Sequence, residues 1–312
     1  MILYFAGNLL SAEKSMYDAG VRCRLLSFAE IDLWGKDAFE FWIENKPPDV
    51  RIFLDSGAYG AFTRGITIDI KRYCEYIKEH ADKLHTVASL DKIGDWRGSA
   101  RNYDLMRAEG VHPVPTVHMG SPDSELRRIL ALEDHIALGG VVGATQNTMS
   151  PWLDQCMRTL RDFWPKKVHI FGVTAQWALE RYPFYTADSS AAILGGGMGR
   201  VSAFVEGKVT VMGWQDYAKE FYDGDVMDHI ANVRAKKGSA HVGRRVINVS
   251  GQLKLQKHIS DVWRKRGVVW EDETCAQFMG PSVEASTIAC STASDSPLGT
   301  VVETVDEASV TS

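Results

Sequence analysis

Short apolar segments recur along this chain, and turn residues follow each of them. Between these segments, apolar residues return every three or four positions, as at Ile70, Tyr73, Cys74 and Ile77, which is the spacing of an amphipathic helix. We expect eight strands, at residues 2–6, 23–28, 52–54, 84–90, 113–117, 135–138, 168–173 and 184–187. We expect helices between them, among them residues 32–44, 68–80, 99–109, 124–132 and 152–163.

Strands that alternate with helices form βαβ units and a parallel sheet. Eight such strands favour closure into a (β/α)₈ TIM barrel, whose interior is filled by side chains. An open, doubly wound sheet is the alternative, but Ala6-Gly7-Asn8 after the first strand carries one glycine instead of the Gly-x-Gly-x-x-Gly pattern. The sequence therefore predicts an α/β fold of the TIM-barrel type over residues 1–200.

The pattern changes after the eighth strand. The glycine-rich residues 195–199 predict a flexible loop, and residues 202–205 and 208–212 predict a hairpin that turns at Glu206-Gly207. Two helices are expected to follow, at residues 214–236 and 252–265. We expect residues 201–280 to form a C-terminal hairpin and basic helices packed on the barrel, and the acidic, Ser/Thr-rich residues 281–312 to be disordered.

The composition is that of an ordinary water-soluble globular protein, with 312 residues of which 45% are hydrophobic and 24% charged. No apolar run reaches the roughly 18–20 residues of a membrane span, and no basic leader precedes the apolar N-terminus. The five cysteines are scattered and odd in number, which predicts reduced thiols and no disulfide framework. We therefore expect a cytoplasmic protein without a membrane partner.

The net charge of −5 conceals an uneven distribution. Residues 231–267 carry ten Lys or Arg and one acid, Asp261, which is a local net charge of +9. Such a stretch in a mildly acidic protein favours a face that binds a polyanion, although a solvated helix face paired with acids elsewhere would look the same. The candidate phosphate contacts are Lys254, Lys257, Arg264, Lys265 and Arg266.

Polar residues and glycines stand at the ends of the expected strands, where a barrel places its active site. The residues concerned are Asp55, Asp91, His118, Gly139, Gly140, Phe171 and Asp188. A lone strand-end aspartate is commonly a helix N-cap, which is the alternative for Asp55 in the segment RIFLDSGAYGAFTR. Three converging carboxylates favour a site.

Paired carboxylates suit displacement at an electrophilic carbon, in which one attacks the carbon and another handles the proton. Gly139 and Gly140 would let a flat ligand reach backbone N–H groups, and Tyr59 and Phe171 could stack on its faces. These features describe a nucleobase site, and they fit a sugar hydrolase as well.

Six short motifs occur in order between residues 51 and 190, namely LDSGAYG, SLD, VH, ALGG, HIFGV and TADSS. This series resembles the tRNA-guanine transglycosylase superfamily. The segment RYPFYTADS at residues 181–189 is more similar to the phage branch, the DNA-guanine transglycosylase-like proteins that put 7-deazaguanines into DNA.

The resemblance implies that Asp188 attacks C1′ of a guanosine and expels guanine, with Asp55 as general acid and base. Asp91 would accept hydrogen bonds from the N1–H and 2-amino edge of guanine. The family pattern also makes Ser56, Tyr59, His118, Gly139, Gly140 and Phe171 substrate-binding residues. The co-substrate would be a 7-deazaguanine base of the preQ0 type, and a base in a duplex would have to flip out.

Three departures from the family pattern change the expectation. Ala58 replaces the second motif glycine, Gly60 replaces a glutamine, and His118 stands where the tRNA enzymes have another glutamine. Cys275 and Cys290 lack paired spacing, so we predict no zinc site and no other cofactor. Because the zinc-bearing region grips tRNA in the family, its replacement by basic helices favours DNA as the polymer. A tRNA substrate, a barrel that binds nucleic acid without chemistry, and a need for partner proteins remain alternatives.

Overall fold

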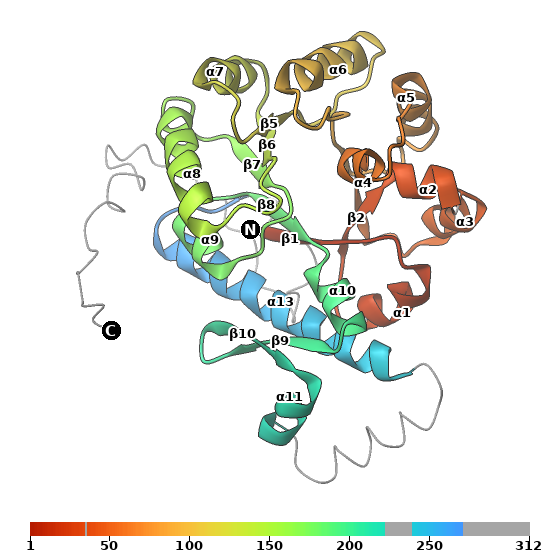
Figure 1. Ribbon diagram of the computed structural model, residues 1–312, viewed down its shortest axis with the longest axis vertical. Helices are drawn as coiled ribbons and strands as arrows, with labels where there is room; N and C mark the ends of the chain where they lie inside the picture. Colours follow the sequence, from red (N-terminus) through yellow and green to blue (C-terminus); the bar gives the residue numbers. More distant parts are fainter. Residues whose placement is uncertain (35, 222–238, 271–312) are drawn as a thin grey trace.

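The computed structural model describes residues 1–34, 36–221 and 239–270, and it has an α/β fold (Figure 1). Eight parallel strands form one sheet in the order β4-β3-β2-β1-β8-β7-β6-β5. The strands are β1 (Ile2–Ala6), β2 (Cys23–Ser27), β3 (Arg51–Asp55), β4 (Thr86–Val87), β5 (Thr116–His118), β6 (His135–Gly139), β7 (Lys167–Ile170) and β8 (Thr186–Ser189). The prediction of alternating strands and helices with a parallel sheet is confirmed.

The two outer strands of this order, β4 and β5, are joined through residues that flank them, Ala88 directly after β4 and Val114 shortly before β5. Ala88 and Val114 form a parallel bridge, the Ser89 amide donates to the Val114 carbonyl at 2.9 Å, and the Val114 amide donates to the Val87 carbonyl at 2.8 Å. The sheet therefore curls into a TIM-barrel-like arrangement, and the carboxyl ends of all its strands face the same edge.

Helices surround the sheet (Figure 1). They are α1 (Leu10–Asp18), α2 (Phe28–Trp34), α3 (Lys36–Asn45), α4 (Ala58–Thr63), α5 (Ile70–Glu79), α6 (Trp96–Ala108), α7 (Asp123–Leu132), α8 (Gln146–Arg161), α9 (Gln176–Arg181) and α10 (Ala191–Gly197). In α5 the apolar stripe is buried as its spacing predicts, with Tyr73, Cys74, Tyr76 and Ile77 on the inner face. None of the helices that the structure describes is long and apolar enough to cross a membrane.

Four strands differ from the sequence expectation by two residues or more. The strand β5 begins three residues later than predicted, at Thr116, and β7 ends three residues earlier, at Ile170. The strand β4 has two residues, Thr86 and Val87, instead of the predicted seven. Beyond them Ala88 makes only an isolated bridge to Val114, and the Leu90 amide contacts the Met106 sulfur of α6 at 3.3 Å instead of a neighbouring strand.

The strand β8 begins two residues later than expected and continues to Ser189. Asp188 therefore lies within the strand, in register with Tyr4 of β1.

Several helix boundaries also differ. The expected helix at residues 32–44 is two helices, α2 and α3. The helix α8 begins at Gln146, six residues before the predicted start, and holds Pro151 in its second turn. Proline disfavours helical backbone in the residue before it, yet Pro151 and Ser150 are both part of this helix.

The prediction of a flexible loop at residues 195–199 is wrong, because Gly195, Gly196 and Gly197 end the helix α10. A Cβ added at Gly196 would lie 2.7 Å from the Arg245 Cγ and 3.1 Å from the Arg245 amide nitrogen. The glycines thus allow a close helix–helix contact instead of marking a loop.

The partner of α10 in this contact is α13 (Ser239–Lys265), which begins thirteen residues before the predicted residue 252. It also packs on α1, α9 and β1. In Figure 1, α13 runs between the sheet and the hairpin segment that follows α10. The Met1 amino group donates to Ser260 Oγ at 3.0 Å, and the Leu3 amide donates to Gln256 Oε1 at 2.8 Å. This helix therefore packs against β1, from the residue that precedes the strand into the strand itself.

The predicted hairpin is confirmed as β9 (Arg200–Val205) and β10 (Lys208–Gly213), which pair antiparallel. Its turn residues Glu206 and Gly207 both have positive φ, as a tight two-residue hairpin requires. Asn248 of α13 holds the hairpin, since its Oδ1 accepts from the Ser202 amide at 2.7 Å and its Nδ2 donates to the Arg200 carbonyl at 3.2 Å.

Beyond the hairpin lies α11 (Trp214–Phe221). The remainder of the helix expected at residues 214–236, and the predicted tail at residues 281–312, lie outside the described residues. The division of the chain at residues 200 and 280 stays a prediction.

Two glycines of α13 provide a test of how this helix is held. A Cβ at Gly251 would overlap the Ser202 carbonyl oxygen of β9, whereas a Cβ at Gly243 would meet nothing within 4 Å. Gly243→Ala should raise the free energy of unfolding by about 1 kcal/mol through helix propensity. Gly251→Ala should lower it by about 1–3 kcal/mol through overpacking. Urea denaturation would measure both, and an equal rise in the two variants would contradict this packing.

Candidate active site

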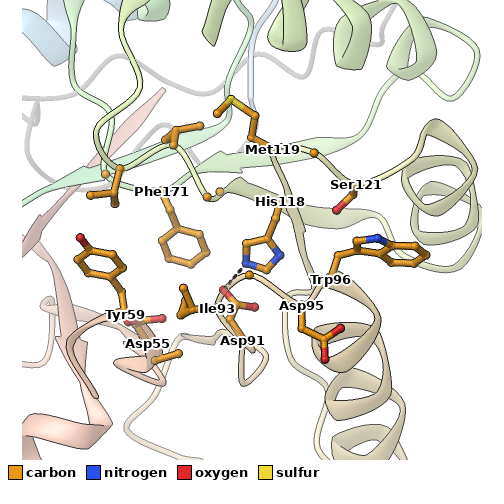
Figure 2. A pocket seen from close by; sticks show the side chains of 18 residues that line it. Asp55, Tyr59, Asp91, Ile93, Asp95, Trp96, His118, Met119, Ser121 and Phe171 are labelled. Atoms are coloured by element: carbon orange, nitrogen blue, oxygen red, sulfur yellow. Dashed lines mark ion pairs between the residues drawn. The ribbon is translucent and has the colours of Figure 1, made fainter. Parts of the chain in front are cut away.

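A cavity of about 490 Å³ lies at the edge of the sheet where the strands end (Figure 2). Seven of the predicted site residues line it: Asp55, Tyr59, Asp91, His118, Gly139, Gly140 and Phe171. They come from the ends of β3, β4, β5, β6 and β7 and from α4, so residues far apart in the sequence meet here because the carboxyl ends of parallel strands share one edge.

Asp55 is the last residue of β3, and its Oδ2 accepts the Gly57 amide hydrogen at 2.9 Å. Gly57 has φ +78°, and a Cβ there would overlap the Ser27 hydroxyl and lie 2.8 Å from the Ala29 Cβ. Glycine is therefore required at this turn. The N-cap of the following helix is Gly57 itself, so the alternative in which Asp55 is a simple helix N-cap does not apply.

The pKa of Asp55 is raised from 3.8 to about 7. Burial is the main cause, because it penalises the charged form, and the neighbouring charge of Asp91 adds to it. The Gly57 amide opposes the shift, and the charge of Asp188 contributes a smaller increase. Near neutral pH this carboxyl can therefore both hold and release a proton, as a general acid and base must.

Asp91 and His118 form a pair on the cavity wall, with His118 Nε2 3.1 Å from Asp91 Oδ2. Burial lowers the pKa of His118. The hydrogen bond to Asp91 and the negative charge of Asp91 raise this pKa by more than burial lowers it, so the net shift is upward. Asp91 Oδ1 is buried and has no hydrogen-bond partner among the described residues. An unused buried acceptor at a cavity is suited to a ligand that carries N–H groups.

The two glycines at the end of β6 let the cavity reach this pair. Gly140 has φ +71°, and a Cβ there would lie 3.2 Å from the Cβ of His118 and from the Met119 amide nitrogen. A Cβ at Gly139 would lie 2.9 Å from the Thr116 Cγ2. Larger side chains would therefore push against His118 or β5.

The two predicted stacking rings are held differently. Phe171 follows β7 and packs on the barrel interior, with its ring centroid 4.3 Å from that of His169 and 5.8 Å from that of Phe53. Tyr59 projects from α4 and is 50% exposed. Both rings face the same part of the cavity, above the carboxyl groups of Asp55 and Asp91 (Figure 2). The cavity thus has one aromatic wall that is packed into the barrel, Phe171, and one that is half exposed, Tyr59.

Asp188 is placed differently from the expectation, because it lies next to the cavity without lining it. Its Oδ1 accepts the amide hydrogen of Gly172, a residue of the cavity wall, at 2.8 Å. Only 6% of Asp188 is exposed. One hydrogen bond therefore separates the predicted nucleophile from the cavity.

His169 contacts Asp188 and was not identified from the sequence. It is fully buried in β7, its Nε2 lies 3.3 Å from Asp188 Oδ1, and its Nδ1 is 2.8 Å from the hydroxyl of its register partner Thr186. The rings of Tyr4 and Phe53 pack around it. The sequence signal that could have identified it is a polar histidine within the otherwise apolar strand segment HIFGV.

Ser56 does not line the cavity. It is buried, and its hydroxyl oxygen accepts from the Ala58 amide at 3.4 Å, which makes it part of the turn that presents Asp55. Further wall residues that sequence reasoning missed are Trp96, Met119 and Ser121. The Ser121 hydroxyl is buried and has no hydrogen-bond partner in the part of the chain that the structure describes.

The predicted phosphate contacts on α13 lie away from the cavity. Lys257 and Arg264 both pair with Asp261, at 2.9 and 2.7 Å, and Arg266 donates to the Glu180 carbonyl oxygen. This end of α13 lies beside Met1, at the start of β1, and therefore at the opposite edge of the sheet.

The five basic side chains at this end of α13 are exposed, namely Lys254, Lys257, Arg264, Lys265 and Arg266. The structure does not bring them to the candidate site. Their role as phosphate contacts stays a prediction.

Within residues 1–34, 36–221 and 239–270, no group of three or more His, Cys, Asp or Glu side chains is arranged to hold a metal ion. The described cysteines Cys23, Cys74 and Cys156 are buried free thiols, and Cys275 and Cys290 lie outside these residues.

No protein-family model and no curated protein matches this chain. Support for a function thus comes from the ordered strand-end motifs and from the arrangement of their side chains. A proton carrier at Asp55, an open acceptor at Asp91 and a third carboxylate at Asp188 can together serve a displacement reaction.

The shifted pKa of Asp55 predicts how stability depends on pH. Between about pH 4 and 7 the folded protein holds a proton that the unfolded chain releases, so this group's contribution to the free energy of unfolding falls as the pH rises. Asp55→Asn removes the free-energy cost of ionising this buried carboxyl, which is about 1.4 kcal/mol for each unit by which the pKa is raised. The variant should therefore be a few kcal/mol more stable than the wild type at pH 8 and equal to it at pH 4. Denaturation curves across this range would check it, and a pH-independent difference would contradict it.

Proposed function

We propose that this protein is a nucleic-acid guanine transglycosylase of the tRNA-guanine transglycosylase superfamily, built on a closed (β/α)₈ barrel. It exchanges guanine in DNA for a 7-deazaguanine base of the preQ0 type. The observation that carries the proposal is the placement of Asp55, Asp91 and Asp188 together at the C-terminal edge of the sheet, with the pKa of Asp55 raised to about 7.

In the first half of the reaction, an Asp188 oxygen bonds to C1′ while the bond from C1′ to the guanine N9 breaks. The electron pair of that bond leaves with guanine, and Asp55 supplies the proton that neutralises the departing base. A protonated carboxyl near neutral pH supports this role for Asp55.

In the second half, the incoming base gives its N9 proton to Asp55 and its N9 bonds to C1′. The bond from C1′ to Asp188 breaks, and the carboxylate is released. Two inversions at C1′ leave the configuration unchanged, and the reaction needs no co-reactant besides the 7-deazaguanine.

The cavity walls support recognition of guanine. The open Asp91 Oδ1 can accept hydrogen bonds from the N1–H and 2-amino edge, while His118 holds the other oxygen. Backbone at Gly139 and Gly140 meets the carbonyl of the base. Tyr59 and Phe171 lie on the same part of the cavity and can stack on the ring, which offsets the loss of stacking when the base flips out.

The position of Asp188 sets a condition for this mechanism. Because its carboxylate lies behind the Gly172 amide, the turn at Phe171 and Gly172 must move when the substrate binds. Gly172 has φ +71°, a glycine conformation that can change at low steric cost.

DNA is the proposed polymer, and tRNA is the alternative within the same chemistry. A barrel that binds nucleic acid without chemistry is a third possibility, which the grouped carboxylates disfavour. We propose that the reaction takes place in the cytoplasm, which is the host's if a phage encodes the protein. Partner proteins are compatible with this scheme.

An exchange assay tests the function. The protein is mixed with guanine-containing duplex DNA, single-stranded DNA or tRNA, and radiolabelled guanine or preQ0 is offered. The wild type should place label in DNA, and Asp188→Asn should lower the rate at least about a thousandfold while leaving DNA binding intact. Asp134→Asn is a matched control, because its side chain is 95% exposed and lies before β6, at the opposite edge.

The outcomes separate the alternatives. Label in tRNA alone would keep the mechanism and replace the polymer. Equal rates in the wild type and Asp188→Asn would remove Asp188 as the nucleophile. If no polymer takes up label, the remaining alternative is a barrel that binds nucleic acid without chemistry.

A further inference from the structure

The loop between β4 and α6 and the first turns of α6 carry three cationic side chains beside the cavity, Lys92, Arg97 and Arg101. Lys92 Nζ lies 3.3 Å and Arg101 Nη2 lies 3.6 Å from Asp95 Oδ2, and Asp95 lines the cavity. Two cations thus share one exposed acid, and Arg97 adds a third positive charge. Residues 91–101 thus carry three cations and two acids, Asp91 and Asp95, and Asp91 is engaged with His118 at 3.1 Å, so this rim of the cavity is net positive.

Arg97 makes a cation–π contact with an aromatic residue of the same rim. Its guanidinium carbon lies 4.4 Å from the ring centroid of Trp96, which lines the cavity. Arg97 is exposed, and it has no ion-pair partner among the described residues. The stacked ring limits the freedom of the guanidinium, so less entropy is lost when it binds an anion.

Helix α4 bears two exposed aromatic rings, Tyr59, which lines the cavity, and Phe62, which does not. Tyr59 and Phe62 are three residues apart on α4, hence on one face of that helix, and they are 50% and 61% exposed. Tyr59 and Trp96 lie at opposite ends of the cavity in Figure 2. Exposed rings near a basic rim are the combination that proteins use for single-stranded nucleic acid, with phosphates on the cations and bases on the rings.

We propose that Lys92 and Arg97 bind the phosphates that flank the nucleotide held in the cavity, and that Phe62 stacks on the adjacent base of the same DNA strand. This assignment rests on the proposed function, because that function supplies the polymer. It places the phosphate contacts at the cavity mouth and not on the distant end of α13.

The test compares two pairs of cations at opposite edges of the sheet. Lys92→Gln/Arg97→Gln removes two positive charges at the cavity mouth, and Arg264→Gln/Lys265→Gln removes two from the end of α13, so both variants have the same net charge. The affinity for a fluorescein-labelled single-stranded DNA is measured by anisotropy between 50 and 200 mM NaCl.

Each lost phosphate contact on a single strand should reduce the slope of log K against log salt by about 0.7. We expect the slope of the cavity-mouth variant to fall by about 1.4 and that of the α13 variant to equal the wild type. An unchanged slope in the cavity-mouth variant, or a fall in the α13 variant alone, would overturn the proposal.

Phe62→Ala tests the stacking contact. Loss of one base–aromatic stack should weaken binding about fivefold or more, with the salt slope unchanged because no charge is removed. Phe41→Ala is the matched control, because Phe41 is 71% exposed on α3 and should leave binding unchanged. Equal effects of the two substitutions would remove Phe62 from the contact.

The same proteins are assayed for base exchange, which separates this proposal from the proposed function. A wild type that exchanges bases while the cavity-mouth variant keeps its salt slope would overturn the rim contacts alone. Binding that depends on Lys92 and Arg97 without any exchange would overturn the transglycosylase and retain the rim. A wild type that does not bind DNA would overturn the rim contacts and leave the exposed rings to a protein partner.

Discussion

The carboxyl groups of Asp55, Asp91 and Asp188 lie near one another at a partly buried edge of the sheet, where their negative charges would repel one another. Local contacts offset this repulsion at each of the three. His118 pairs with Asp91, the Gly172 amide and His169 lie against Asp188, and the raised pKa of Asp55 relieves the remainder through proton uptake. The amides of Gly57 and Gly172 each donate a hydrogen bond to one of these carboxylates, Asp55 and Asp188. A fold that holds these groups together thereby also holds a proton available at neutral pH.

The two edges of the sheet differ in structure. The edge at which the strands begin is closed by the end of α13, where Met1 bonds to Ser260 and the Trp263 indole donates to the Leu179 carbonyl at 2.8 Å. Basic residues there pair with Asp261 on the same helix, as expected of a solvated helix face. The edge at which the strands end carries the cavity, its open acceptor on Asp91 and its basic and aromatic rim. Our proposals assign chemistry and polymer binding to this second edge, so that the reacting base and its flanking phosphates are held by adjacent loops.

Asp188 and His169 couple the cavity to the interior of the sheet. Both are buried, and they are joined to Phe171 and Gly172 by ring packing and a hydrogen bond. In the proposed reaction a movement of that turn would at once uncover the carboxylate and shift one of the stacking rings. Substrate binding and exposure of the nucleophile would then be a single event, which would limit reaction with water in the empty site.

The sequence by itself determined the alternation of strands and helices, the hairpin, and the gathering of Asp55, Asp91 and His118 at one edge. These follow from local periodicity and from the rule that parallel strands end on the same side. Only the tertiary structure decided that residues 195–197 are helical, that α13 begins at Ser239, that Asp188 lies behind Gly172 with His169 beside it, and that the basic end of α13 faces away from the cavity. Each of these depends on contacts between residues distant in the chain, such as Gly196 with Arg245 and Met1 with Ser260. Local sequence patterns do not encode such contacts, because the same pattern is compatible with several packing partners.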